Sequence, residues 1–340
     1  MIITRTPFRI PLGGGSTDLP SYYSQFGGFI FGVAVNLYMY IGLNRPPIDD
    51  RIRFKYSRSE EVDQLSELQH RIGRATLERI GIRDGIEVVS VADVPEGTGM
   101  GSSGSYAVGL MHALRALRRD LIPVKDLAEE SCDIIMNTLG LPDGKQDPYL
   151  VALGGFQRLD ISPDGQVEAT RLDLARPVVE DFEYNTLLFY TGLRRSSEEI
   201  LFDQTQKVVS GNRQTLEAKH RIKDIGIRVL NAFQEGDLTM FGRLMDEHWR
   251  VKKSISQKIS SDWLDALYNE AKQAGALGGK LMGAGGGGFF IFYCEGLARS
   301  RVRQAMQRLG LREVPFRVDV EGTKVITDHM SHRDNHHYSL

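Results

Sequence analysis

The sequence predicts a mixed α+β fold divided into two domains, and three observations support this prediction. The chain has 340 residues, which exceeds the length of a typical single domain. Patterns typical of strands and of helices alternate through both halves, and no fixed-period repeat interrupts them. The composition, 41% hydrophobic and 25% charged, is that of a globular protein with a substantial core. We expect one domain at residues 1–183 and a second at residues 184–340.

Charge and cysteine usage narrow the function classes. The formal net charge is −2, and Lys and Arg are spread along the chain, so a nucleic-acid partner is not expected. Cys132 and Cys294 are two distant thiols, which suggests a reduced compartment and a cytoplasmic location. Neither a signal peptide nor 18 consecutive apolar residues occurs, so no membrane association is expected.

The first half begins with strand-like apolar stretches and then changes to a helical period. Residues 2–10 and 29–43 are rich in β-branched and aromatic residues and predict two strands. Residues 61–80 carry apolar side chains at helical spacing, and residues 86–94 predict a strand that ends before Pro95. Residues 107–117 repeat apolar side chains every three or four positions, which predicts an amphipathic helix.

The second half repeats this alternation. We expect strands at residues 185–191, 279–282, 289–293 and 316–320, and helices at residues 197–209, 215–234 and 262–274.

Glycine is the one residue type in excess, with 36 in the chain. Many lie in three short segments, at residues 13–15, 97–104 and 283–288. Clustered glycines let the backbone approach a ligand or another loop closely. These segments are therefore the first places to look for a functional site.

The central segment joins a predicted strand to a predicted helix, a position that suits an anion. Inward-turned backbone N–H groups and the positive end of the helix would stabilise a phosphate without any lysine. Ser102 and Ser103 could contact phosphate or Mg2+. The candidate nucleotide-binding residues are Pro95, Gly97, Gly99, Met100, Gly101, Ser102, Ser103 and Gly104. The alternative is a glycine-rich turn with Ser102 as the helix N-cap.

Two other kinds of phosphate-binding loop are also rich in glycine. A Walker A loop requires lysine before its Ser or Thr, and none is present. Gly99, Gly101 and Gly104 do match the spacing of a dinucleotide-binding loop, which leaves an NAD-dependent enzyme as one alternative. The turn is longer than that fold uses, however, and Asp120 follows a helix end where a second strand would be needed.

The other two glycine segments carry charged neighbours. Arg9 precedes the first segment, and Asp18 follows it with two carboxylate oxygens that could accept hydrogen bonds from sugar hydroxyls. A surface arginine and a turn-capping aspartate are the alternatives. In the third segment, four consecutive glycines between two apolar strands exceed the two residues that a plain hairpin needs.

Taken in order, the three segments resemble the three motifs of the GHMP kinases (galacto-, homoserine, mevalonate and phosphomevalonate kinases). The central one matches the phosphate loop P-x-G-x-G-x-x-S-S. Within the superfamily the resemblance is closest to the heptose 7-phosphate kinase branch. It rests on GGGSTDLPSYY at residues 13–23, GKQD at 144–147, TGLRRSSEEIL at 191–201 and GGKLMGAGGGGF at 278–289.

The resemblance implies a fold and a set of roles. The fold would be a ribosomal-S5-like N-terminal domain and a ferredoxin-like C-terminal domain, with ATP and Mg2+ in the cleft between them. Asp147 would be the catalytic carboxylate, paired with Arg9 or Lys145; alone, Asp147 could be a loop cap before Pro148. The substrate-binding candidates are Gly14, Gly15, Ser16, Thr17, Asp18, Lys145, Arg194, Arg195, Gly285 and Gly286.

The metal site departs from the family pattern. Ile135 and Met136 stand where these kinases usually carry a Mg2+-binding glutamate. Ser102, Ser103 and Glu129 are the candidate ligands here, Glu130 and Asp133 on the same expected helix are alternatives to Glu129, and Mg2+ often keeps several waters.

The activity implied is transfer of the ATP γ-phosphate to the anomeric hydroxyl of D-glycero-D-manno-heptose 7-phosphate, giving the 1,7-bisphosphate used for capsule or lipopolysaccharide heptose. Arg194 and Arg195, with Lys145 or Lys280 opposite, would hold the phosphate that this sugar already carries. A fucokinase-like or galactokinase-like enzyme and a catalytically silent sugar sensor are the alternatives. The expected partners are small molecules, and a homodimer is compatible with the sequence.

Overall fold

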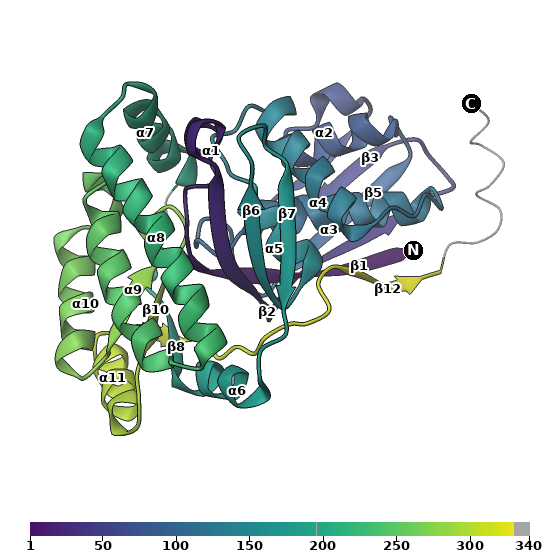
Figure 1. Cartoon of the computed structure of the whole chain (residues 1–340). Helices are drawn as coiled ribbons and strands as arrows, with labels where there is room; N and C mark the ends of the chain where they lie inside the picture. Colours follow the sequence, from purple (N-terminus) through teal and green to yellow (C-terminus); the bar gives the residue numbers. More distant parts are fainter. Residues whose placement is uncertain (195, 330–340) are drawn as a thin grey trace.

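The computed structural model describes residues 1–194 and 196–329 and contains two sheets covered by helices (Figure 1). In spatial order, the main path of the larger sheet is β12 (Lys324–Asp328), β1 (Ile2–Gly13), β2 (Gly28–Asn44), β5 (Ile86–Ala92), β3 (Ile52–Lys55) and β4 (Ser59–Val62), and β6 (Phe156–Ile161) and β7 (Val167–Leu172) branch from β2. The smaller sheet has the order β11 (Arg312–Glu313), β8 (Thr186–Tyr190), β10 (Phe289–Tyr293) and β9 (Gly278–Leu281).

The α-helices are α1 (Pro20–Phe26), α2 (Arg71–Ile80), α3 (Ser102–Leu117), α4 (Val124–Asp133), α5 (Gln146–Leu153), α6 (Arg176–Asn185), α7 (Ser197–Val209), α8 (Arg213–Glu235), α9 (Leu238–Lys253), α10 (Asp262–Gln273) and α11 (Leu297–Arg308). Short helical turns of other types occupy Leu65–Glu67, Ile134–Thr138 and Gln257–Ile259.

The long strands β1 and β2 lie next to each other at the centre of the larger sheet. They run antiparallel along most of their length, and β3 and β5 make the sheet's one parallel pairing. Helices α3 and α5 pack on both strands, and α8 of the second half also contacts them. The first and last strands of the described chain are neighbours, because β12 pairs with β1.

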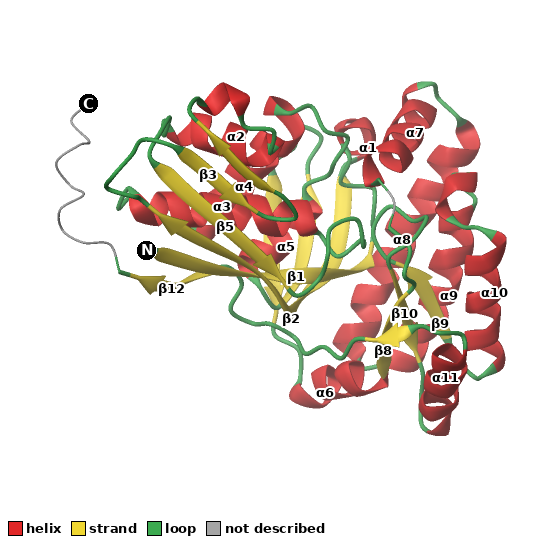
Figure 2. Ribbon diagram, turned by 180° about the vertical axis from the view of Figure 1, so that it is seen from behind, coloured by secondary structure: helices red, strands yellow, loops and turns green. Residues whose placement is uncertain are grey.

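The smaller sheet is antiparallel throughout. Helix α9 packs on β9, and α10 and α11 contact each other beside the sheet (Figure 2). Figure 2 also shows that the N-terminus lies on the far side of the larger sheet from this region.

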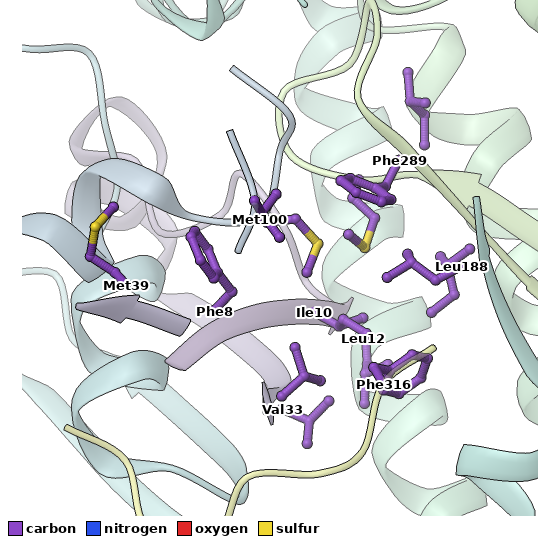
Figure 3. Close-up of a cluster of buried hydrophobic side chains, with 14 of the residues drawn as sticks. Phe8, Ile10, Leu12, Val33, Met39, Met100, Leu188, Phe289 and Phe316 are labelled. Carbon is purple, nitrogen blue, oxygen red and sulfur yellow. The ribbon is translucent and has the colours of Figure 1, made fainter. Parts of the chain in front are cut away.

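The two halves share a continuous apolar core. Phe8 and Leu12 of β1 are completely buried (Figure 3). Leu188 of β8 and Phe289 of β10 join the same cluster from the smaller sheet, as does Phe316 from the segment that returns to the larger one. Burial of apolar surface stabilises by roughly 25 cal/mol per Å². The shared core thus holds the facing edges of the two halves in a fixed relation, which a site built between them requires.

The predicted α+β class is confirmed, and most predicted elements lie close to their observed bounds. Two predictions were wrong in detail. Within residues 61–80 the α-helix occupies only Arg71–Ile80, because the preceding residues form the end of β4 and a short turn of helix. Residues 316–320 form no strand and contribute a single bridge between Val318 and Val35. The division at residue 183 stays a prediction, although β12 returns from the second half to the larger sheet.

Among residues 1–194 and 196–329, none of the helices combines the length and the apolar character needed to span a bilayer.

Candidate active site

A cavity of about 130 Å³ opens where the three glycine segments meet the start of α5. Helices α7 and α9 contribute further side chains to its wall. The predicted residues that line it are Arg9, Gly15, Ser16, Asp18, Gly97, Gly99, Gly101, Ser102, Ser103, Asp147 and Gly285. Segments from distant parts of the sequence therefore converge on one space.

The central glycine segment forms a turn that leads directly into α3. Gly99 and Gly101 have φ angles of 79° and 87°, a left-handed conformation that side chains disfavour. An added Cβ at Gly99 would lie 2.7 Å from the carbonyl oxygen of Met282. Glycine is therefore required here for contact with the third glycine segment as well as for the turn. Gly101 is the N-cap of α3, so the positive end of that helix faces the cavity.

Arg9 connects this turn to Asp147. Its Nε and Nη2 atoms both lie 2.7 Å from Oδ1 of Asp147, and Nη1 donates to the carbonyl of Gly99 at 2.6 Å. The guanidinium is almost fully buried, and the carboxylate is 13% exposed on the cavity side. An ion pair with this geometry fixes the orientation of the carboxylate.

Asp18 lies deeper than Asp147 and is held by α5. The backbone N–H of Gln146 donates to its Oδ2 atom at 3.0 Å, and the Gln146 side-chain amide donates to Oδ1 at 3.2 Å. Burial raises the pKa of Asp18, although the hydrogen bond from the Gln146 backbone opposes this shift. Burial also raises the pKa of Asp143 to about 7, and the nearby Asp147 carboxylate adds to the rise. One wall of the cavity thus carries three carboxyl groups.

The part of the cavity wall that comes from the second half of the chain is basic. His248 and Lys252 come from α9, and Lys280 comes from β9. Burial, together with the smaller effect of the positive charge of Arg9, lowers the pKa of Lys252 to about 7. Burial also lowers the pKa of Lys280 and of His248 well below their usual values, with neighbouring cations adding to both shifts.

Several polar atoms in the cavity wall lack a hydrogen-bond partner within the described protein. They are Ser102 Oγ, Gln146 Oε1, Gln204 Oε1 and both ring nitrogens of His248. Buried polar atoms are normally satisfied, and each exception calls for a ligand, water or ion. The cavity is therefore built for a polar occupant.

Six other predicted site residues do not line the cavity: Gly14, Thr17, Pro95, Met100, Gly104 and Gly286. Thr17 is an example: its Oγ1 atom lies 2.8 Å from the carbonyl oxygen of Gly14 and 2.9 Å from that of Phe29, and it accepts a hydrogen bond from the Phe29 backbone N–H at 3.0 Å. Such contacts fix the conformation of the first glycine segment, although Thr17 itself does not face the cavity.

Three further predicted residues are not part of the cavity. Glu129 forms an ion pair with Lys145 and accepts a hydrogen bond from Tyr149, and these residues line a separate depression. The carboxylate of Glu129 is thus engaged away from Ser102 and Ser103, so it does not complete a metal site with them. Arg194 is exposed and absent from the cavity wall. Arg195 lies outside the described residues.

The described residues contain no cluster of three or more His, Cys, Asp or Glu side chains arranged to hold a metal ion. For Mg2+, the unpartnered Ser102 hydroxyl at the start of α3 is the feature that fits. Ser103 adjoins it, and Mg2+ bound beside phosphates needs few protein ligands.

Sequence reasoning missed Asp143, Gln204, His248 and Lys252. A signal for two of them was present, because His248 and Lys252 are four residues apart on the otherwise apolar face of α9. That helix was not among the predicted elements, so its buried polar positions could not be recognised.

Comparison with known proteins agrees with this geometry. Residues 67–155 match the family model described as the GHMP kinases N terminal domain, and residues 229–310 match that of the GHMP kinases C terminal. A D-glycero-alpha-D-manno-heptose 7-phosphate kinase of Campylobacter jejuni is 27% identical over 338 residues, covering 95% of this chain and 98% of that protein.

Two further proteins extend the comparison. An L-fucokinase/L-fucose-1-P guanylyltransferase of Bacteroides fragilis is 26% identical over 86% of this chain and 34% of its own length. The crystal structure of a D-glycero-D-manno-heptose 1-phosphate kinase from Bacteriodes thetaiotaomicron superposes with a TM-score of 0.80. That structure is 24% identical and covers 97% of this chain and 100% of its own. The chain is a kinase of the GHMP family, with both the N-terminal and the C-terminal domain of that family.

Proposed function

We propose that this kinase transfers the γ-phosphate of ATP to the anomeric hydroxyl of D-glycero-D-manno-heptose 7-phosphate and releases the 1,7-bisphosphate. The observation that carries the proposal is the Arg9–Asp147 pair, which lines one cavity together with the start of α3 and the first glycine segment. The heptose 7-phosphate kinase relative, similar along almost the whole chain, supports this choice of acceptor.

The turn before α3 supports binding of the ATP phosphates. Its left-handed glycines and the N-terminus of α3 offer backbone N–H groups and a positive dipole to an anion. Ser102 and Ser103 would hold Mg2+, which neutralises phosphate charge when it is bound.

Asp147 suits the role of the base that orients the acceptor. In the transfer, the acceptor oxygen forms a bond to the γ-phosphorus, and the bond from that phosphorus to the ADP oxygen breaks. The hydroxyl proton passes to the Asp147 carboxylate. Arg9 holds this carboxylate in position and supplies positive charge beside the phosphates.

Asp18 and the first glycine segment suit the sugar. The carboxylate of Asp18 is fixed by Gln146, whose own Oε1 atom lacks a partner and lines the same cavity. Oriented carboxylate and amide oxygens accept hydrogen bonds from vicinal hydroxyls. The product would supply a route to nucleotide-activated heptose.

The test is ADP release by purified enzyme with ATP, Mg2+ and a panel of acceptors. We expect heptose 7-phosphate to give the largest kcat/KM. Preference for L-fucose or galactose would contradict the acceptor that we propose and favour a fucokinase-like or galactokinase-like enzyme. If no sugar of the panel leads to release of ADP, the result would favour the catalytically silent sensor.

A thermal-shift comparison of ATP with NAD addresses the dinucleotide alternative, because the true ligand raises the melting temperature with its occupancy. The cytoplasmic location and the homodimer stay predictions.

A further inference from the structure

The basic wall of the cavity contains two lysines without an acidic partner. Nζ of Lys252 donates to the carbonyls of Leu281 and Gly283, at 3.0 and 2.6 Å. Nζ of Lys280 donates to the carbonyl of Leu12 at 3.3 Å, and the residue is only 2% exposed. Among the described residues, no carboxylate forms an ion pair with either ammonium group.

Another buried lysine shows that this arrangement is unusual for the chain. Lys219 is also fully buried, but the negative charge of Asp18 acts on it and opposes the loss of its proton. Lys280 instead lies within electrostatic reach of Lys252 and Arg9, and Lys252 within reach of Arg9, so protonation of both lysines places like charges together. Burying like charges together is unfavourable unless an anion compensates them.

His248 adds a second, independent observation. It is 3% exposed and lines the cavity, and neither ring nitrogen has a hydrogen-bond partner. Lys280 and Lys252 both act electrostatically on this ring, so it lies close to the two ammonium groups. An oxyanion between these three side chains would accept hydrogen bonds from all of them.

The position of the cluster favours an anion carried by the acceptor over the phosphates of ATP. Lys280 contacts Leu12, which directly precedes the first glycine segment, and that segment is where the sugar is proposed to bind. The ATP phosphates would lie at the start of α3, where backbone N–H groups and the helix dipole already serve an anion.

We propose that His248, Lys252 and Lys280 bind the phosphate monoester that the acceptor sugar already carries. This inference rests on the proposed function and deepens it, since it assigns residues to recognition of a phosphorylated sugar. Of the residues expected to hold this phosphate, it keeps Lys280 and replaces Arg194 and Lys145, because neither of these two lines the cavity; Arg195 lies outside the described residues.

The test compares heptose 7-phosphate with the same heptose lacking its phosphate. Lys280→Met, Lys252→Met and His248→Phe are each measured with both acceptors. Loss of one charge-assisted hydrogen bond should lower kcat/KM for the phosphorylated sugar by roughly tenfold to a hundredfold. The value for the unphosphorylated sugar should change less than threefold, so the preference for the phosphate collapses.

Lys207→Met is the matched control. Lys207 also donates to a backbone carbonyl, that of Ile255, but it pairs with Asp203 and lies outside the cavity wall. This variant should keep the wild-type preference. If the cavity variants lose kcat/KM equally for both sugars, the proposal is overturned. It is also overturned if the KM of ATP rises while the KM of the sugar stays unchanged.

A binding measurement separates this inference from the proposed function. Inorganic phosphate is titrated into the enzyme saturated with ADP and Mg2+, so that the turn before α3 is occupied. We expect binding to wild type and its loss in Lys280→Met and Lys252→Met, whichever sugar the enzyme phosphorylates. Undiminished phosphate binding in both folded variants would contradict the anion site, while absence of heptose turnover alone would contradict only the proposed acceptor.

Discussion

The two walls of the cavity differ in charge and in how well their groups are paired. The wall from the first half carries Asp18, Asp143 and Asp147, and two of these carboxylates have fixed partners in Gln146 and Arg9. The wall from the second half carries Lys252 and Lys280, whose ammonium groups donate to backbone carbonyls and pair with no carboxylate within residues 1–194 and 196–329.

This difference indicates a division of tasks. A prearranged carboxylate can orient a hydroxyl and accept its proton without help from the ligand. Unpaired buried cations instead remain unfavourable until an anion arrives. The acidic wall is thus suited to the reacting end of the acceptor, and the basic wall to recognition of its charge.

The largest expected effect belongs to the acidic wall. Asp147→Asn keeps the shape of the side chain but removes the proton acceptor, so kcat should fall by about 10²-fold to 10⁴-fold. Steady-state assay of ADP release measures it. Asp173→Asn alters an exposed aspartate outside the cavity and should retain wild-type kcat. A kcat for Asp147→Asn within threefold of wild type would remove Asp147 from the chemistry.

A smaller loss of kcat should follow when the contact of Arg9 with Asp147 and with the turn before α3 is weakened. Arg9→Lys keeps the charge, but a single Nζ atom cannot reproduce the contacts that Nε and Nη2 make with Asp147 together with the one that Nη1 makes with the carbonyl of Gly99. We expect kcat to fall by about a hundredfold, with less change in the KM of ATP. An unchanged kcat would mean that charge alone matters at this position.

The pH dependence of acceptor binding tests the basic wall. Burial and, secondarily, the positive charge of Arg9 lower the pKa of Lys252 to about 7, and Lys280 and the ring of His248, whose pKa values are also lowered, lie nearby. Below this pKa the ammonium is charged and binds an anion; above it the charge is lost, and kcat/KM for heptose 7-phosphate should decline, by up to about tenfold per pH unit. The decline should disappear in Lys252→Met, and its persistence there would assign it to another group.

The smallest expected effect is on stability, and its sign is informative. Because the pKa of Lys252 is lowered from 10.5, the unfolded chain binds more protons than the native one between about pH 7 and 10.5. Stability from this group therefore rises with pH across that window. Lys280 has a pKa lowered in the same direction.

Replacing Lys280 by the apolar Met should consequently raise the free energy of unfolding at pH 7, by about 1 kcal/mol, while it impairs the enzyme. Urea unfolding followed by circular dichroism measures the change. A large loss of stability would instead indicate that Lys280 is a structural residue.

Much of the fold was predictable because local patterns were strong. The β-branched and aromatic residues of the stretch 29–43 predicted β2, and the glycine turn before α3 was predicted from its place between strand and helix. The helix predicted over residues 61–80 was too long, because apolar residues at helical spacing occur before Arg71, where the observed helix begins. There, Glu60 and Glu61 pair with β3 in a strand whose stability comes from its neighbour.

The site was predictable where glycine or a charged motif marked it. Arg9, Asp18, Ser102 and Asp147 were identified and meet in one cavity. Lys145 was placed wrongly with respect to this cavity because its position next to Gln146 does not determine which way the side chain points; it turns to Glu129. Lys252 could not be found from spacing alone, since its meaning depends on burial beside Lys280, 28 positions later in the sequence.

The most direct test of the central claim is ³¹P NMR of the product made from ATP and heptose 7-phosphate. The account predicts a second phosphate signal, coupled to the anomeric proton, which appears as ATP is converted to ADP. A new phosphate on any other carbon, or hydrolysis of ATP without a new sugar phosphate, would contradict it.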